Sequence, residues 1–152
     1  MSGIKQQATS RRSPVLWDQA QLFTMLTRDL IQAYMHHMGI ELDEFYALPE
    51  YDRFVIGAYA CGFVCRDYAP MDGELFEQMK SRPQEHLATC SFNRLRHWTH
   101  TLLRSERWNY GYSSPVMEAL DSGSLELLIQ RLETDNHLIE PEIIEDTAGK
   151  AP

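Results

Sequence analysis

Cysteine is scarce in this chain. The 152 residues include only Cys61, Cys65 and Cys90. An odd number of thiols, in a chain long enough to bury a core of its own, does not fit the disulfide framework of small secreted domains. The sequence therefore predicts free thiols and a reducing compartment, the cytoplasm.

Long hydrophobic runs are also missing. The longest uncharged apolar run, residues 54–65, is shorter than the roughly 20 residues that a membrane-spanning helix needs. Residues 1–13 contain no apolar segment typical of a secretory signal. We therefore expect a soluble cytoplasmic protein that makes no direct contact with a membrane.

Positive charge is in the minority. Fourteen Lys and Arg face 22 Asp and Glu, which gives a formal net charge of −8. Such a chain repels phosphate backbones, so non-specific binding to nucleic acid or to anionic lipid is excluded. Solubility is the commonest reason for an acidic composition; docking onto a basic protein surface and mimicry of nucleic acid also fit it.

Motifs for common enzyme chemistry are absent from the sequence. It has no Gly-rich phosphate loop, no His-Glu-x-x-His and no Gly-x-Ser-x-Gly. We therefore expect no cofactor, and we expect a binding protein more than an enzyme.

Apolar residues recur at spacings of three and four, the period of an amphipathic helix, and no segment alternates as a strand does. The first such pattern follows Ser13-Pro14, a helix-start signal, and Gly39 ends it. Pro49 opens a second helix, predicted to run through residues 54–65, whose small residues admit a close neighbour. Further helices are predicted at 72–80, from Phe92 into residues 104–111, and on either side of Gly123.

These patterns predict one all-α domain, a helical bundle of about five to seven helices. A composition of 43% hydrophobic and 24% charged residues is typical of a globular protein. The expected divisions are a flexible arm at residues 1–12, a helical domain at 13–134 and an acidic, partly mobile tail at 135–152.

The segment Leu102–Gly111 concentrates charge and aromatic side chains at the end of a predicted helix. The structural interpretation is that its arginines face the negative end of the helix dipole and that Glu106 pairs with one of them. The functional interpretation is a protein interface, because Trp, Tyr and Arg are enriched in binding hot spots. The candidate partner-binding residues are Arg104, Glu106, Arg107, Trp108 and Tyr110.

A second candidate site is a basic stripe on the same helix. Arg94, His97, Thr101 and Arg104 follow one another at spacings of three and four. With Arg107 they could hold a phosphate, a nucleotide or an acidic loop, because Arg offers paired donors. Neutralisation by the protein's own Asp and Glu is the alternative.

A zinc site is the third candidate. Cys61 and Cys65 are spaced as i and i+4 on one predicted helix, and His97 and His100 as i and i+3 on another, so four ligands could converge. The spacing lacks the short Cys-x-x-Cys of structural zinc sites, and both cysteines continue an apolar stripe. We therefore favour buried thiols, and no metal.

Four segments of the C-terminal half form a pattern with the residue 54–64 run and Asp67-Tyr68 upstream of them. The four segments are Leu102-Leu103-Arg104-Ser105-Glu106-Arg107-Trp108, Gly111, Asp121-Ser122-Gly123 and Leu125 to Leu132. Over roughly residues 54–133 this pattern resembles the bacterial domain of unknown function DUF6508. The sequence departs from the family pattern at Asn109-Tyr110 and Pro70. The resemblance implies a compact helical domain of bacteria, phages and mobile elements with no established activity.

Two functional hypotheses follow. The first is a non-catalytic acidic protein that inhibits or recruits a larger bacterial protein, such as a nucleic-acid-handling complex; the phage-like resemblance suggests an anti-CRISPR inhibitor as one instance. The second is a phosphate-binding or enzymatic domain that uses Arg94, His97, Arg104 and Arg107. The sequence leaves the oligomeric state open, a homodimer included.

Overall fold

The computed structural model describes the backbone of residues 3–134 and the side chains of residues 18–133, so the predicted tail at 135–152 lies outside the described residues. The described part is all-α without strands, as predicted. It has eight helices, above the predicted range, because a connector and a predicted break each form one short helix (α2 and α5). The helices are α1 (Gly3–His36), α2 (Leu42–Tyr46), α3 (Pro49–Ala60), α4 (Gly73–Ser81), α5 (Pro83–His86), α6 (Phe92–Trp108), α7 (Pro115–Ser122) and α8 (Ser124–Thr134).

Helix α1 begins earlier than the sequence predicts. It starts at Gly3 and not at Pro14, so it runs through most of the segment expected to be a flexible arm. The Ser-Pro signal is not decisive here because residues 4–13 contain no glycine or other proline that would end a helix.

Helix α3 ends earlier than predicted. Its last residue is Ala60, and Gly62 follows with a φ of +84°, a left-handed conformation that side chains other than glycine rarely adopt. Residues 61–65 therefore leave the helix, and the predicted helical pair Cys61 and Cys65 does not exist. The close neighbour expected at the small residues is present at Gly57, where an added Cβ would lie 2.3 Å from Leu26 of α1.

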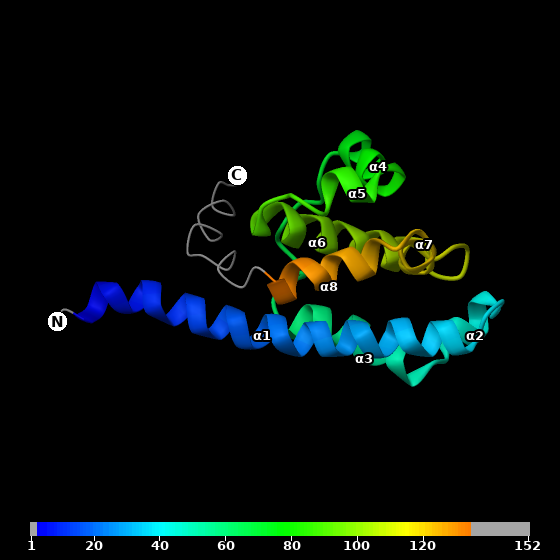
Figure 1. Ribbon diagram of the computed structural model, residues 1–152, viewed down its shortest axis with the longest axis horizontal. Coiled ribbons are helices and arrows are strands. Elements are labelled where there is room, and N and C mark those ends of the chain that lie inside the picture. Colours follow the sequence, from blue (N-terminus) through cyan, green and yellow to red (C-terminus); the bar gives the residue numbers. More distant parts are fainter. Residues whose placement is uncertain (1–2, 135–152) are drawn as a thin grey trace.

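The helices pack around one cluster of buried residues. Helix α1 lies alongside α3 and also contacts α8, while α7 contacts both α6 and α8 (Figure 1). Phe23 of α1 stands at the centre of the α1–α3 contact, with its ring centroid 5.4 Å from that of Phe54 and 4.5 Å from that of Phe63. The short helices α4 and α5 lie on the side of α6 away from α1 and α3 (Figure 1).

Local signals fix the helices that carry the candidate site. The Ser91 hydroxyl accepts the Arg94 amide at the start of α6, and the Ser114 hydroxyl accepts the Met117 amide at the start of α7. Serine is among the residue types most favoured at this position. Gly123 ends α7 with a φ of +82°, as its position between the last two helices predicts.

Candidate functional site

Three faces of α6 meet three different parts of the molecule. One face binds the segment 61–71 that joins α3 to α4, a second lines a hollow beside α3, and a third lines a cavity beside α4 and α7. The helix ends in the exposed turn that follows Trp108. Its sequence periodicity identifies an amphipathic helix but cannot separate these three environments.

The first face holds the backbone of segment 61–71. Each contact joins an α6 side chain to a main-chain group of the segment. The contacts therefore hold the backbone path of segment 61–71 without involving the side chains of that segment. The contacts are Arg96 Nε to Gly62 O (2.9 Å), Cys65 N to His100 Nδ1 (3.2 Å), Arg104 to Arg66 O (3.4 Å), His100 Nε2 to Tyr68 O (2.7 Å), His97 Nε2 to Ala69 O (2.9 Å) and Met71 N to Thr101 Oγ1 (2.9 Å).

His100 is buried in the middle of this face. Its Nδ1 accepts the Cys65 amide, so Nε2 carries the hydrogen that is donated to Tyr68 O. Burial lowers the pKa of His100 to about 4, and the nearby Arg104 charge acts in the same direction. The ring is therefore neutral at physiological pH, as its two hydrogen bonds require.

This arrangement corrects the predicted anion stripe. Arg94 and Arg107 lie thirteen positions apart on α6, which is about 20 Å along a helix axis. His97 and Arg104 between them bind loop carbonyls. The four residues do not form one anion pocket. Within the part of the chain that the structure describes, no carboxylate forms an ion pair with Arg94, Arg104 or Arg107.

The predicted zinc ligands are likewise not brought together. Among the described residues no three Cys, His, Asp or Glu side chains form a group that could hold a metal. Cys61 is buried, Cys65 is exposed in the loop, and both histidine rings are engaged with loop carbonyls. The pair fails because α3 ends before Cys65.

Glu106 is not a surface residue. Its side chain is 2% exposed, and its carboxylate accepts hydrogen bonds from Tyr51 Oη (2.7 Å), Ser114 Oγ (2.9 Å) and the Val116 amide (3.0 Å). The predicted pairing with Arg104 or Arg107 is wrong because these donors lie on α3 and at the start of α7. A carboxylate at the first turn of α7 also faces the positive end of that helix.

Burial dominates the electrostatics of this network. It raises the pKa of Glu106, while the three donors lower it. It also raises the pKa of Tyr51, and the bond to the carboxylate acts in the same direction, so the hydroxyl stays protonated and donates. Glu106 therefore joins α3, α6 and α7 from the inside, directly beneath the exposed end of α6.

The turn after α6 exposes three large aromatic side chains. Trp108 is 66% exposed, Tyr110 58% and Tyr112 89%, and Arg107 beside them is exposed as well. Exposed aromatic residues in one short segment are unusual on a surface that serves only solubility. We call Arg107, Trp108, Tyr110 and Tyr112 the aromatic turn.

Two contacts hold this turn in place. The Arg104 guanidinium carbon lies 5.7 Å from the centroid of the Trp108 ring, a cation–π arrangement. Tyr110 stacks on Tyr46 of α2, with centroids 4.1 Å apart and planes at 19°, and the Gly111 amide donates to the Tyr46 hydroxyl at 3.0 Å. The rings of Trp108 and Tyr110 are thus ordered before any partner binds.

A hollow of about 280 Å³ adjoins the turn, between α3 and the end of α6. Tyrosines form much of its wall, and Asp52, Glu106 and Arg107 are its acidic and basic residues. Glu106 lies at its inner side. The complete lining is Tyr46, Tyr51, Asp52, Val55, Tyr59, Leu103, Glu106, Arg107 and Tyr110.

The structure places four of the five predicted partner-binding residues at or near this surface. Arg107, Trp108 and Tyr110 are exposed, Arg104 is partly buried behind Trp108, and Glu106 lies inside. The sequence analysis does not predict that the tyrosines of α2 and α3 belong to this surface. They lie far from α6 in the sequence, and no residue pattern indicates that the two segments are in contact. Their concentration between Tyr46 and Tyr59 is the one feature that could have drawn attention to them.

Comparisons of the chain with protein-family models, with curated proteins and with solved structures find no match. The resemblance to DUF6508 therefore stays a prediction. In the described part of the chain, no helix has the length and apolar character needed to cross a membrane.

Proposed function

We propose that this protein is a non-catalytic binding protein that docks onto a larger protein through the aromatic turn. The observation that carries the proposal is the exposure of Trp108, Tyr110 and Tyr112 beside Arg107. Trp, Tyr and Arg dominate the binding energy of protein interfaces, where a few anchors near the centre contribute most of it.

Preorganisation supports this use of the turn. The stacking of Tyr110 on Tyr46 and the contact of Arg104 with Trp108 limit the conformations of the exposed rings before binding. Ordering flexible side chains costs affinity, so rings that are already ordered bind more tightly. The buried network of Glu106 fixes the backbone on which the turn is built.

Charge around the turn favours a basic partner surface. Residues 41–52 carry five carboxylates and no Lys or Arg, on the helices that supply Tyr46 and the α3 wall of the hollow. Asp52 lines the hollow itself. A Lys or Arg side chain of the partner fits there, because tyrosine faces attract cations and carboxylates neutralise them.

We infer that the protein inhibits or recruits its partner by docking through this ordered aromatic surface. An anti-CRISPR role, in which a basic nucleic-acid-binding surface is blocked, is the specific instance suggested by the phage-like resemblance and by the acidic charge. A site for phosphate on Arg94, His97, Arg104 and Arg107 is not favoured, because His97 and Arg104 bind loop carbonyls.

The test is a comparative pull-down from the lysate of the source cell. Tagged wild-type protein and the double variant R107A/W108A are used as baits, and proteins that co-purify at stoichiometric yield are compared. We expect the wild type to retain a larger protein with a basic surface and the double variant to lose it. Equal retention by both baits would refute the aromatic turn as the docking surface.

A matched control separates loss of docking from general loss of an exposed apolar side chain. Ile56 on α3 is 63% exposed, a fraction similar to the 66% of Trp108. Ile56 does not line the hollow. We expect I56A to retain the partner. Circular dichroism of the wild type, R107A/W108A and I56A should show equal helicity, since none of the substituted side chains is buried.

A further inference from the structure

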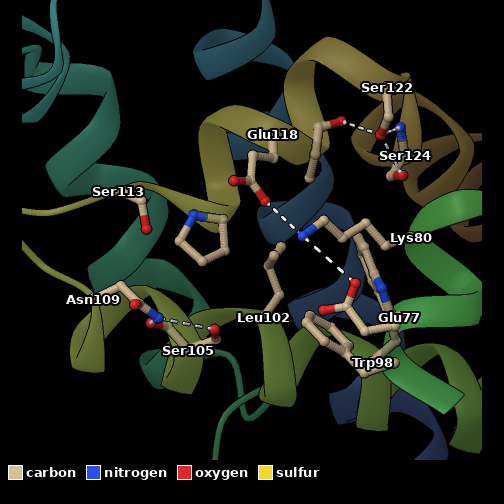
Figure 2. A pocket seen from close by; sticks show the side chains of 13 residues that line it. Glu77, Lys80, Trp98, Leu102, Ser105, Asn109, Ser113, Glu118, Ser122 and Ser124 are labelled. Atoms are coloured by element: carbon tan, nitrogen blue, oxygen red, sulfur yellow. Dashed lines mark hydrogen bonds and ion pairs between the residues drawn. The ribbon is translucent and has the colours of Figure 1, made fainter. Parts of the chain in front are cut away.

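A cavity of about 240 Å³ lies on the third face of α6 and shares no lining residue with the hollow lined by the tyrosines. It opens between α4, α6 and α7, with the start of α8 at one end (Figure 2). Its volume is roughly eight times the 30 Å³ that one water molecule takes in the liquid. It is smaller than the pockets that hold drug-sized ligands.

One wall of the cavity holds an unpartnered donor. Trp98 lines the cavity, is 2% exposed, and its indole Nε1 has no hydrogen-bond partner. A buried N–H without an acceptor is destabilising, and buried polar atoms usually have a hydrogen-bond partner. An oxygen acceptor inside the cavity would relieve this destabilisation.

The mouth of the cavity carries both signs of charge. The Lys80 ammonium lies 2.9 Å from a Glu118 oxygen and 3.8 Å from a Glu77 oxygen (Figure 2). Two carboxylates and one ammonium leave a net negative charge, which attracts an amino group. The hydroxyls of Ser122 and Ser124, 2.7 Å apart, stand on one side, and Asn109 bonds Ser105 on the other.

We propose that this cavity binds a small zwitterion with the chemistry and size of a free amino acid. Its carboxylate accepts the Trp98 N–H and a hydrogen from Lys80, and its amino group faces Glu77 and Glu118. The unpartnered Trp98 N–H and the net negative charge at the mouth favour a molecule that carries a hydrogen-bond acceptor at one end and a positive charge at the other. None of the four residues of the aromatic turn lines the cavity, although Asn109, between Trp108 and Tyr110, does.

The test is titration of ¹⁵N-labelled protein with each standard L-amino acid at millimolar concentration, followed on the tryptophan indole N–H resonances. The chain has three tryptophans, and W98F assigns the relevant peak. We expect at least one amino acid to move the Trp98 peak downfield in a saturable way while the Trp108 peak stays in place. If none moves it saturably, as when only water fills the cavity, the proposal is overturned.

A surface variant keeps the test informative if W98F does not fold. Lys80 is at the mouth with its side chain 43% exposed, so K80Q should fold while losing the second donor to the ligand's carboxylate. We expect at least tenfold weaker binding of the amino acid by K80Q. Arg53, which pairs with Glu50 on α3, provides the control R53Q, which should bind as the wild type does. Equal affinity of K80Q and wild type would refute the carboxylate assignment.

Discussion

The hydroxyl of Tyr51 donates a 2.7 Å hydrogen bond to the buried carboxylate of Glu106. This bond joins α3 to the last turns of α6, and the same carboxylate accepts the Ser114 hydroxyl and the Val116 amide at the start of α7. Three helices thus converge on one charged group that has little contact with water. The exposed aromatic turn is built on the backbone between Glu106 and Ser114.

Removing the Tyr51 hydroxyl tests this convergence. Y51F leaves a buried carboxylate with one donor fewer, and a hydrogen bond to a charged group contributes about 1.5–3 kcal/mol. We expect the free energy of unfolding, measured with urea, to fall by about 2 kcal/mol. The side-chain hydroxyl of Tyr59, also on α3, has no hydrogen bond to another described residue, although the Tyr59 carbonyl accepts the Gly62 amide, so Y59F is the control. A loss for Y51F no larger than that for Y59F would contradict the role of the bond.

His100 makes stability depend on pH. Burial lowers its folded-state pKa to about 4 from an ordinary value of 6.5, so the folded state binds fewer protons than the unfolded state between these values. The stabilising contribution is complete above pH 6.5 and is lost as pH falls toward 4. The loss amounts to roughly 3 kcal/mol, at 1.36 kcal/mol per pKa unit.

The difference between wild type and H100Q isolates this contribution, because other titrating groups, including Glu106, act in both proteins. Unfolding free energies should be measured at intervals from pH 7 to pH 4. We expect the wild type to lose stability more steeply than H100Q over this range. Parallel curves for the two proteins would show that His100 is not held neutral by its contacts with segment 61–71.

Tyr46 is expected to order the aromatic turn. Its hydroxyl accepts the Gly111 amide at 3.0 Å, and its ring stacks on Tyr110. Y46F keeps the stacking and removes the acceptor, whereas Y46L removes both. We expect faster hydrogen exchange at the Gly111 amide in Y46F, and weaker partner binding in Y46L than in Y46F. Unchanged exchange in Y46F would mean that the hydroxyl does not hold the turn.

The three thiols should differ in reactivity. Cys65 is exposed in segment 61–71, whereas burial raises the pKa of both Cys61 and Cys90. Alkylation requires the thiolate, so a raised pKa and poor access both slow it. We expect iodoacetamide to modify Cys65 first, as seen by peptide mass spectrometry of briefly treated native protein. Modification of Cys61 at the same rate would contradict the burial described for it.

The sequence predicts most helix boundaries correctly because their signals are local. Ser91, Ser114 and Gly123 act through groups within three residues of themselves, so their effect can be read without tertiary structure. Helix α3 shows the limit of such reading. Its apolar run continues past Gly62 into segment 61–71, because burial against α1 and α6 requires apolar residues whether or not the backbone is helical.

The candidate site is predictable only in part. The aromatic turn is contiguous, so its concentration of Trp, Tyr and Arg is visible in the sequence. The partner of Glu106 is not, since Tyr51 lies 55 positions away and nearby arginines offer a more obvious pairing. The role of the basic stripe is not predictable for a similar reason. Its side chains bind main-chain carbonyls of segment 61–71, and every residue has a carbonyl, so the sequence does not indicate which ones are bound.

The measurement that tests the central claim most directly is the dissociation constant of the captured partner for W108A, compared with wild type and with I56A. A hot-spot residue contributes about 2 kcal/mol or more, which is roughly thirtyfold in affinity. We predict at least this loss for W108A, with I56A within experimental error of wild type and equal thermal stability for all three. A W108A protein that binds its partner as tightly as wild type would contradict docking through the aromatic turn.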